Sequence, residues 1–277
     1  MILGIDLGGT NVRLGQLVDG KLINKIIEPS PGQMSLDESL SYLKAQIQRV
    51  ITPETRGIGV GVPSVLDSET GIVYNVANIP SWVEVPLKDI LESEFRIPVY
   101  INNDSNCFTL GEKKIGEGRS FKHLVGVTLG TGVGAGIIIN NHLYGGSNTG
   151  AGEIGCLPYL DATLEDYCGS MFFKTHYNTT GKEAAEKAMN KNSEAITIWN
   201  EFGRHMGRLV EAIVLSYDPE AIIFGGGITA AFPLFEQAMK EAMTDFPYPK
   251  SIEKLQIRIS TNPDIAILGA AALVEED

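Results

Sequence analysis

Apolar residues occur in short runs along the first part of the chain, and glycine-containing turns separate the first three runs. The pattern predicts strands over residues 2–6, 12–18 and 21–28. Leucine, isoleucine and valine then recur at helical spacing, which predicts a helix over residues 36–51. The next predicted elements are strands at 56–62 and 99–102 and helices at 85–95 and 104–114. This part of the sequence therefore has the order βββαβαβα.

The second half repeats this order of elements. We predict strands at 123–129, 133–139 and 142–144, followed by a polar, glycine-rich stretch and helices that continue to residue 216. A strand at 221–224, a helix at 232–245, a strand at 255–259 and a helix at 264–274 complete the chain. The halves match in element order and not in residues, so the hypothesis is an α/β fold built from a duplicated βββαβα unit. Ligands would bind in the cleft between the two copies.

Three glycine-rich turns adjoin predicted strands. They read Asp6-Leu-Gly-Gly-Thr-Asn11, Leu129-Gly-Thr-Gly-Val-Gly-Ala-Gly136 and Phe224-Gly-Gly-Gly227. Each could be an ordinary hairpin turn. Successive backbone N–H groups in such turns also form concave anion sites, and a carboxylate at the end of a buried strand is costly unless it holds a cation. Because Asp6 occupies that position, the turns favour a clamp for a polyphosphate with its metal.

Composition narrows the class of protein. The chain has 277 residues and a formal net charge of −12, which argues against nucleic acid and anionic membranes as partners. Cys107, Cys156 and Cys168 show no CxxC spacing, so we expect no disulfide framework and a reducing cytoplasm. We expect no signal peptide before the first strand, and no apolar run reaches membrane-spanning length. The four histidines form no metal pattern, and we expect them in solvent or at helix ends.

Candidate chemistry begins with Asn103 and Asp104, which follow an apolar strand and open a helix. Asp104 could be a helix N-cap, or it could be the general base of a phosphoryl transfer. Asn103 could donate to a substrate hydroxyl. Glu153 and Glu165 singly are typical of a surface, but paired acids beside an Asn–Asp pair suit a polyhydroxylated substrate.

These motifs together resemble the ROK sugar kinases (repressors, open reading frames and kinases) of the actin-like ATPase superfamily, over essentially the whole chain. The three turns match the two phosphate motifs and the adenosine motif, and Asn102-Asn-Asp104 matches the segment of the catalytic base. The resemblance implies a duplicated ribonuclease H-like fold with two lobes. Residues 1–116 would form the small lobe, on which the helix 263–277 would pack back, and residues 117–262 would form the larger lobe.

The resemblance also implies a function, which is transfer of the γ-phosphoryl group of ATP to the 6-hydroxyl of a hexose such as glucose or allose. Asp104 would be the base, and Asp6 would hold Mg²⁺ through water. The residues implied for ATP are Asp6, Gly8, Gly9, Thr10, Asn11, Gly130, Thr131, Gly132, Gly226 and Gly227. The residues implied for the sugar are Ser64, Asn78, Asn103, Asp104, Glu153, Cys156 and Glu165. Trp82 could stack on the sugar or be a plain core residue.

The sequence departs from the family at two places. Cys156 stands where the family has a histidine that touches both the sugar and a structural zinc, and residues 161–163 replace a run of cysteines. We therefore expect no structural zinc and looser discrimination at C1 and C2 of the sugar. Alternatives are a β-glucoside or N-acetylhexosamine kinase, a non-catalytic sugar sensor, and a sugar-responsive repressor. The expected partners are a small-molecule sugar and a second copy in a homodimer, with no nucleic acid and no membrane.

Overall fold

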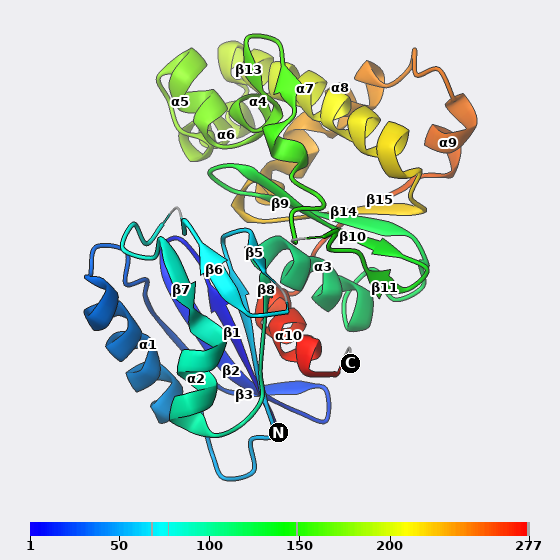
Figure 1. Ribbon diagram of the computed structural model, residues 1–277. Coiled ribbons are helices and arrows are strands. Elements are labelled where there is room, and N and C mark those ends of the chain that lie inside the picture. Colours follow the sequence, from blue (N-terminus) through cyan, green and yellow to red (C-terminus); the bar gives the residue numbers. More distant parts are fainter. Residues whose placement is uncertain (68, 77, 148, 276–277) are drawn as a thin grey trace. The chain divides into compact units, whose positions relative to one another are not determined.

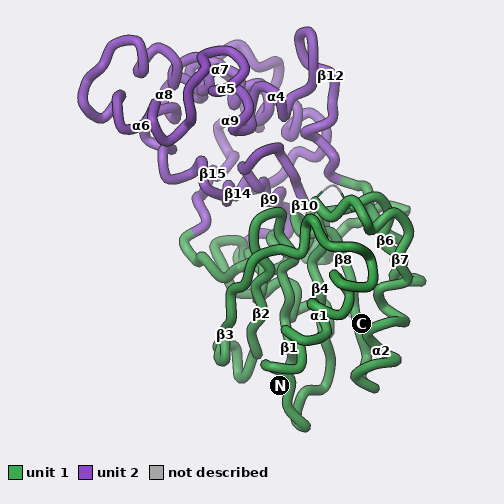
Figure 2. The backbone as a smooth tube through the Cα atoms, turned by 90° about the vertical axis from the view of Figure 1, so that its left-hand side faces the viewer, with its two compact units in different colours: residues 1–120, 136–151, 261–277 green, residues 121–135, 152–260 purple. Residues whose placement is uncertain are grey.

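The computed structural model describes residues 1–67, 69–76, 78–147 and 149–275. The chain divides into two compact units, shown in different colours in Figure 2. Unit 1 contains residues 1–120, 136–151 and 261–277, and unit 2 contains residues 121–135 and 152–260. Of the predicted C-terminal helix 263–277, the last two residues lie outside the described part of the chain.

A five-stranded sheet of order β3-β2-β1-β4-β8 forms the centre of unit 1. Strand β1 pairs antiparallel with β2 and parallel with β4, and β4 pairs parallel with β8. The bounds are β1 Ile2–Leu7, β2 Asn11–Val18, β3 Lys21–Pro29, β4 Ile58–Val62 and β8 Val99–Asn103. The sequence prediction of these strands is confirmed to within two residues at each end.

Two pairs of helices cover the two faces of this sheet. Apolar residues of α1 (Leu36–Val50) and α2 (Leu87–Phe95) share one buried cluster with the strands. On the other face α3 (Asp104–Lys114) packs against α10 (Ile265–Ala272), the red helix of Figure 1, which is followed by the short turn η3 (Leu273–Glu275). This close packing depends on glycine. A Cβ on Gly4 would lie 2.2 Å from the carbonyl oxygen of Ile267, and one on Gly59 would lie 1.7 Å from that of Ala270.

The second five-stranded sheet repeats the first in its topology. Its order is β11-β10-β9-β14-β15, which corresponds strand for strand to β3-β2-β1-β4-β8. The bounds are β9 Leu124–Leu129, β10 Val133–Ile139, β11 His142–Leu143, β14 Ala221–Gly225 and β15 Gln256–Ile259. The predicted duplication of the βββαβα unit is therefore confirmed.

Unit 2 contains further helices between its strands. The longest is α7 (Ser193–Tyr217), whose apolar face packs on α8 (Phe232–Ala242). The remaining short elements are η1 Ile154–Cys156, β12 Pro158–Tyr159, β13 Ala162–Thr163, α4 Leu164–Cys168, α5 Met171–Tyr177, α6 Gly181–Met189, η2 Gly227–Ala231 and α9 Pro249–Lys254. None of the helices in the described part of the chain is both long and apolar enough to cross a membrane.

The sequence analysis missed one small sheet. Strands β5 (Leu66–Asp67), β6 (Ile72–Tyr74) and β7 (Glu84–Pro86) pair in an antiparallel meander. Strands of two or three residues are too short to show a period. The predicted helix at 85–95 consequently begins later, at Leu87, because Val85 and Pro86 belong to β7.

Candidate functional site

The first glycine turn and the candidate base lie at the same edge of the sheet in unit 1. In the strand register Asp6 of β1 pairs with Gly61 of β4, and Gly61 pairs with Asn102 of β8. The three strands are parallel, so their carboxyl ends meet at one edge. The backbone of Asp6 is therefore two strand spacings, or about 10 Å, from the backbone of Asn102, measured across the sheet. Between them Gly61 has no side chain.

Electrostatics connect Asp6 with Asp104 across this edge. Burial raises the pKa of Asp6, and the guanidinium of Arg13, at 4.0 Å, opposes the shift. The buried thiol of Cys107 lies beside Gly61, where it would be 3.1 Å from a Cβ, and its pKa is raised well above its usual value by burial and then by the negative charges of Asp104 and Asp6. Both carboxylates are therefore close enough to Cys107 to affect its pKa. Asp6 and Asp104 together place negative charge at this edge of the sheet, and a bound cation would offset it.

Asn103 and Asp104 have different positions at the start of helix α3. The side chain of Asn103 accepts hydrogen bonds from the backbone N–H groups of Ser105, at 2.9 Å, and Asn106, at 3.3 Å. Asn103 is therefore the N-cap, and the interpretation of Asp104 as the cap is wrong. Asp104 is the first helical residue and accepts a bond of 2.8 Å from the N–H of Ser105. Its carboxylate is only partly buried.

Ser64 and Asn78, the less specific sugar candidates, lie near these groups in unit 1. The amide of Asn103 donates to the carbonyl oxygen of Ser64 at 3.3 Å, and the Ser64 hydroxyl donates to the carbonyl oxygens of Val65 and Tyr74. Asn78 lies against the first glycine turn, because a Cβ on Gly9 would come within 2.7 Å of its Nδ2. The side chain of Asn78 therefore fills part of the space beside Gly9, a residue that the sequence analysis gave to ATP.

Trp82 is a core residue of unit 1. Its side chain is fully buried, and its indole N–H donates to the hydroxyl of Ser39 at 2.7 Å. The alternative that Trp82 stacks on a sugar does not fit this burial.

In unit 2 the second glycine turn is in contact with Glu165. A Cβ on Gly132 would lie 2.3 Å from Oε2 of Glu165, and the same oxygen accepts a bond of 3.4 Å from the N–H of Val133. Gly155 of η1 also permits close packing, since its Cβ would lie 2.3 Å from the carbonyl oxygen of Val133. The turn, η1 and α4 therefore form one compact group.

The three sugar candidates of unit 2 belong to this group. The residue Glu153 is exposed, but nearby protein atoms partly desolvate its carboxyl group. This desolvation, and then the negative charge of Glu165, raise the pKa of Glu153. The exposed Cys156 thiol lies 4.0 Å from Oε2 of Glu153, and burial and the two carboxylates raise its pKa. Two carboxylates and a neutral thiol are thus gathered as acceptors and a weak donor for hydroxyl groups.

A cavity of about 620 Å³ connects the second and third glycine turns in unit 2. Gly130 and Gly227 both line it, and a Cβ on either would meet nothing within 4 Å. Gly226 differs, because its φ of +92° favours glycine and its Cβ would lie 2.2 Å from the carbonyl oxygen of Leu129. The cavity volume is in the range of small-molecule sites.

The sequence analysis missed the residues that α5, α6 and α7 contribute to this cavity. They are Ser170, the N-cap of α5, then Thr180, Gly181, Lys182, Ala185, Glu186 and Met189 from the N-cap and body of α6, and Trp199 of α7. Ala185 and Met189 lie four residues apart, so they share a face of α6, but this spacing is typical of any core-facing helix and gave no signal in the sequence.

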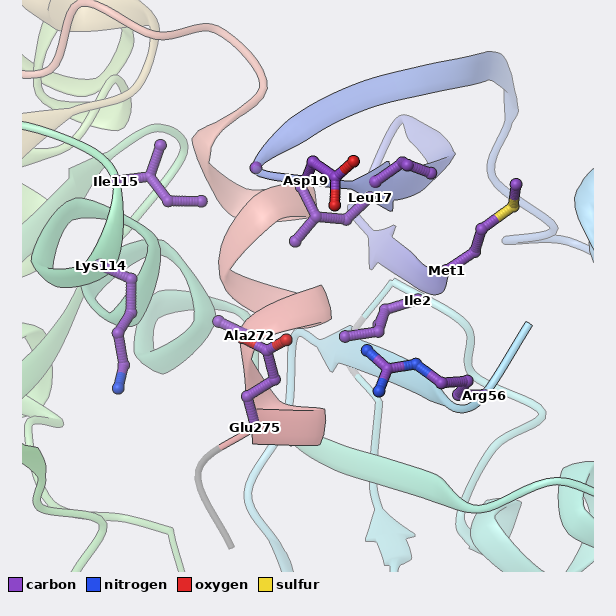
Figure 3. A pocket seen from close by; sticks show the side chains of 11 residues that line it. Met1, Ile2, Leu17, Asp19, Arg56, Lys114, Ile115, Ala272 and Glu275 are labelled. Atoms are coloured by element: carbon purple, nitrogen blue, oxygen red, sulfur yellow. The ribbon is translucent and has the colours of Figure 1, made fainter. Parts of the chain in front are cut away.

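A second cavity, of about 400 Å³, lies in unit 1 (Figure 3). Ile2, Arg56, Ala272 and Glu275 line it. Ile2 is the first residue of β1 and Asp6 comes four residues later, about 13 Å along the strand. This cavity is therefore at the opposite end of the strand from the glycine turn and is not part of the candidate site.

An aromatic cluster supports α4 in unit 2. The Tyr167 hydroxyl donates to Asp161, which raises the pKa of Tyr167 to about 12. The Tyr159 hydroxyl lies 3.0 Å from Nδ1 of His205, and the rings of Tyr167 and His205 are 4.8 Å apart. The expectation that every histidine lies in solvent or at a helix end is wrong for His205, whose side chain is only 12% exposed because these rings cover it.

A bound metal would have few protein ligands here. Among the described residues no group of three or more His, Cys, Asp and Glu side chains could hold a metal ion. Mg²⁺ usually keeps several waters and binds one or two carboxylates together with substrate phosphates. Asp6, a largely buried carboxylate beside a turn of exposed backbone, fits that mode.

Comparison with known proteins identifies the family. The profile of the ROK family matches residues 2–277. The chain belongs to the ROK family. A glucokinase of Thermotoga maritima is 28% identical over 308 residues, with 99% of this chain and 97% of the relative covered. A xylose repressor of Caldicellulosiruptor bescii is 28% identical, with 100% of this chain and 78% of the relative covered. ROK relatives thus include both sugar kinases and repressors.

Solved structures show the same fold. A putative sugar kinase from Cytophaga hutchinsonii superposes with a TM-score of 0.87 at 28% identity, and all of both chains is covered. A ROK glucokinase from Streptomyces griseus, in complex with glucose and AMPPNP, gives a TM-score of 0.84 at 21% identity over 100% of this chain and 99% of that one. The fold of the chain is that of the ROK sugar kinases, the duplicated fold of actin-like ATPases.

Proposed function

We propose that this ROK protein is an ATP-dependent sugar kinase that phosphorylates the 6-hydroxyl of a hexose. The observation that carries the proposal is the row formed by Asp6, Gly61 and Asn102, which brings the first phosphate turn and the Asn103–Asp104 pair to one sheet edge. A kinase needs a phosphate site and a proton acceptor near each other. A non-catalytic sensor has no such need.

In the proposed reaction Asp104 accepts the proton of the sugar hydroxyl. The hydroxyl oxygen then forms a bond to the γ-phosphorus of ATP, and the bond from that phosphorus to the β–γ bridging oxygen breaks, which releases ADP. Mg²⁺ bound near Asp6 would supply neutralisation of phosphate charge. Asn103 stabilises the start of α3 and thereby fixes the position of Asp104.

Different residues are assigned to the phosphates, the nucleoside and the sugar. We assign the phosphates to the turns at Gly8–Asn11 and Gly130–Gly132 and the nucleoside to the cavity between Gly130 and Gly227. We assign the sugar hydroxyls to Asn103, Glu153 and Glu165. The supporting observations are the open space at Gly130 and Gly227 and the gathering of Glu153, Cys156 and Glu165 against the second turn.

The test is ADP release by the purified protein with ATP, Mg²⁺ and a panel of glucose, allose, N-acetylhexosamines and β-glucosides. Asp104→Asn keeps the shape of the side chain but cannot accept a proton. We expect turnover to fall by about 10²–10⁴-fold, the range of general-base catalysis. Because Asn103 remains as the cap, the melting temperature should change little. Wild-type-like turnover in this variant, or no ADP release with any sugar, would refute the proposal.

A further inference from the structure

Thr149 of unit 1 has a backbone conformation that its side chain disfavours. Its φ is +56°, in the left-handed region that β-branched residues rarely adopt. Most other non-glycine residues with a positive φ in the described part of the chain are Asn or Asp, which tolerate this region. Among them Thr149 alone is β-branched, and it is only 4% exposed. A residue strained in this way persists only where the surrounding structure holds it in place.

The hydroxyl group of Thr149 makes two hydrogen bonds to one residue of β5. Its Oγ1 accepts a bond of 3.0 Å from the backbone N–H of Leu66 and donates one of 3.0 Å to the carbonyl oxygen of Leu66. Leu66 pairs with Val73 of β6 on the other side, so both of these backbone groups face away from β6. Because Leu66 is buried, loss of the hydroxyl would leave two buried backbone groups without a partner.

Thr149 lies in a turn that the chain closes on itself. The backbone N–H of Ala151 donates to the carbonyl oxygen of Gly145 at 3.1 Å. A Cβ on Gly146, whose φ is +72°, would lie 3.2 Å from the Cβ of Ala151. The two ends of the turn are therefore in close contact, and the bonds from Thr149 to Leu66 hold the turn against β5.

Both sides of this contact lead to residues that we assign to the sugar or that hold them. On the β5 side, Ser64 comes two residues before Leu66, and its carbonyl oxygen accepts the bond of 3.3 Å from the amide of Asn103. On the other side, Glu153 follows Thr149 by four residues, so it lies within about 14 Å of Thr149. The hydroxyl of Thr149 thus ties the chain just before Glu153 to the strand just after Ser64.

We propose that Thr149 is a positioning residue for the sugar, whose hydroxyl fixes the segment that carries Glu153 against β5. The inference rests on the proposed kinase function for the assignment of Glu153, Ser64 and Asn103 to the sugar site. A turn that only had to be stable would favour glycine or asparagine at this φ. Threonine accepts the strained backbone and supplies a hydroxyl that reaches both backbone groups of Leu66.

The experiment measures sugar affinity, ATP affinity and Tm for wild type and for variants of Thr149. Calorimetry uses ATP and the sugars of the panel above. Thr149→Val keeps the size and the branching of the side chain but has no hydroxyl. We expect its sugar affinity to fall about 5- to 30-fold, up to the size of one charge-assisted hydrogen bond from Glu153, and its ATP affinity to stay within about twofold. Thr149→Ser keeps the hydroxyl and should bind sugar within about threefold of wild type.

Two further variants separate positioning from stability. Thr149→Gly removes the hydroxyl but relieves the strain, so its Tm should fall less than that of Thr149→Val while its sugar affinity falls as much. Thr55→Val is the matched control in unit 1, since Thr55 is 5% exposed and its hydroxyl accepts a bond of 3.0 Å from the N–H of Thr52. Thr55 precedes β4, at the end of the strand away from Gly61. Thr55→Val should lower the Tm by about 2–5 °C and leave the sugar affinity unchanged.

Thr149→Gly decides the question even if Thr149→Val does not fold. Wild-type sugar affinity in the variants without the hydroxyl overturns the role of Thr149 and leaves the kinase proposal standing, provided that wild type releases ADP. An equal loss of sugar and ATP affinity, or a loss of sugar affinity in Thr55→Val, also overturns it, because lowered stability would then be the cause. Wild type that binds a sugar without ADP release, with the same loss in Thr149→Gly, supports Thr149 and rejects the kinase. Wild type that binds no sugar overturns both.

Discussion

The carboxylate of Glu165 occupies the space beside Gly132 where a side chain would otherwise stand, with Oε2 only 2.3 Å from an ideal Cβ. Gly132 belongs to the second glycine turn, which we assign to the phosphates, and Glu165 is assigned to the sugar. The sequence analysis expected a phosphate beside Gly132, so the structure gives this glycine a second role. It lets the carboxylate that we assign to the sugar lie directly on the turn that we assign to the phosphates, within one unit.

Gly132→Ala should therefore disturb the sugar more than the nucleotide. The Glu165 carboxylate is the far end of a flexible side chain, so it would move away and the fold would survive. We expect the KM for sugar to rise about 3- to 30-fold, part of the ~1.5–3 kcal/mol of a charge-assisted hydrogen bond. Steady-state kinetics with each substrate varied in turn provide the measurement. A larger effect on the KM for ATP would contradict the arrangement.

Gly130→Ala should weaken the binding of ATP more than the binding of sugar. Nothing lies within 4 Å of a Cβ at Gly130, so the methyl group meets no protein atom and the melting temperature should not fall. If the turn approaches the phosphates, the methyl group enters the space of the ligand, and we expect ATP affinity to drop by about 10- to 100-fold, as when a bond to a charged group is lost. Calorimetry with ATP and thermal unfolding are measured together. Normal ATP affinity in this variant would remove the second turn from the nucleotide site.

Glu153→Gln should stabilise the sugar-free protein at neutral pH. Burial and Glu165 raise the pKa of Glu153 in the folded state, so between the ordinary pKa of glutamate and the raised one the folded protein holds more protons than the unfolded chain. Stability from this group is present at low pH and is lost as the pH rises through that window. Because the side chain is exposed, the gain in Tm should be small, about 1–2 °C.

The difference in Tm between Glu153→Gln and wild type should vanish below the ordinary pKa of glutamate and reach its full size at neutral pH. Sugar affinity should fall, since the amide has one acceptor oxygen instead of two. The exposed Glu54, in unit 1, provides Glu54→Gln as a control without either effect. A Tm difference that grows as the pH is lowered would contradict the sign of the shift.

Chelation should leave the stability unchanged in the absence of nucleotide. We expect no structural zinc, because Cys156 and Cys168 are isolated thiols and no histidine completes a four-coordinate site. Thermal unfolding with and without o-phenanthroline, together with elemental analysis, tests this expectation. About one zinc per chain, with a Tm that falls on its removal, would show that it is wrong.

Tyr167→Phe should lower the stability of the protein and its affinity for sugar. The variant removes the hydroxyl that donates to Asp161 and so loosens the aromatic cluster around the short helix that carries Glu165. We expect a loss of ~1 kcal/mol, or about 2–4 °C in Tm. The KM for sugar should rise while the affinity for ATP stays the same. Tyr248→Phe, at an exposed tyrosine of the same unit, is the control and should change neither.

The sequence by itself determined the strands of both sheets, the duplication and the three glycine turns. Periodicity and glycine are local signals, and each strand of 2–7 or 133–139 shows them within a few residues. The sequence also identified Asn103 and Asp104 together, because a polar pair that follows an apolar strand can be recognised from the order of residues alone. Which of the two caps the helix depended on side-chain geometry, and only the structure assigned the cap to Asn103.

Tertiary structure alone decided which distant residues share a site. Trp199 and Met189 lie on helices whose apolar faces look like ordinary core, and only the folded unit brings them to Gly130 and Gly227 in one cavity. The contact of Gly132 with Glu165 joins residues that are 33 positions apart and have no common pattern. Contacts of this kind arise from the packing of whole elements, and packing depends on every side chain between them, so no local pattern contains them.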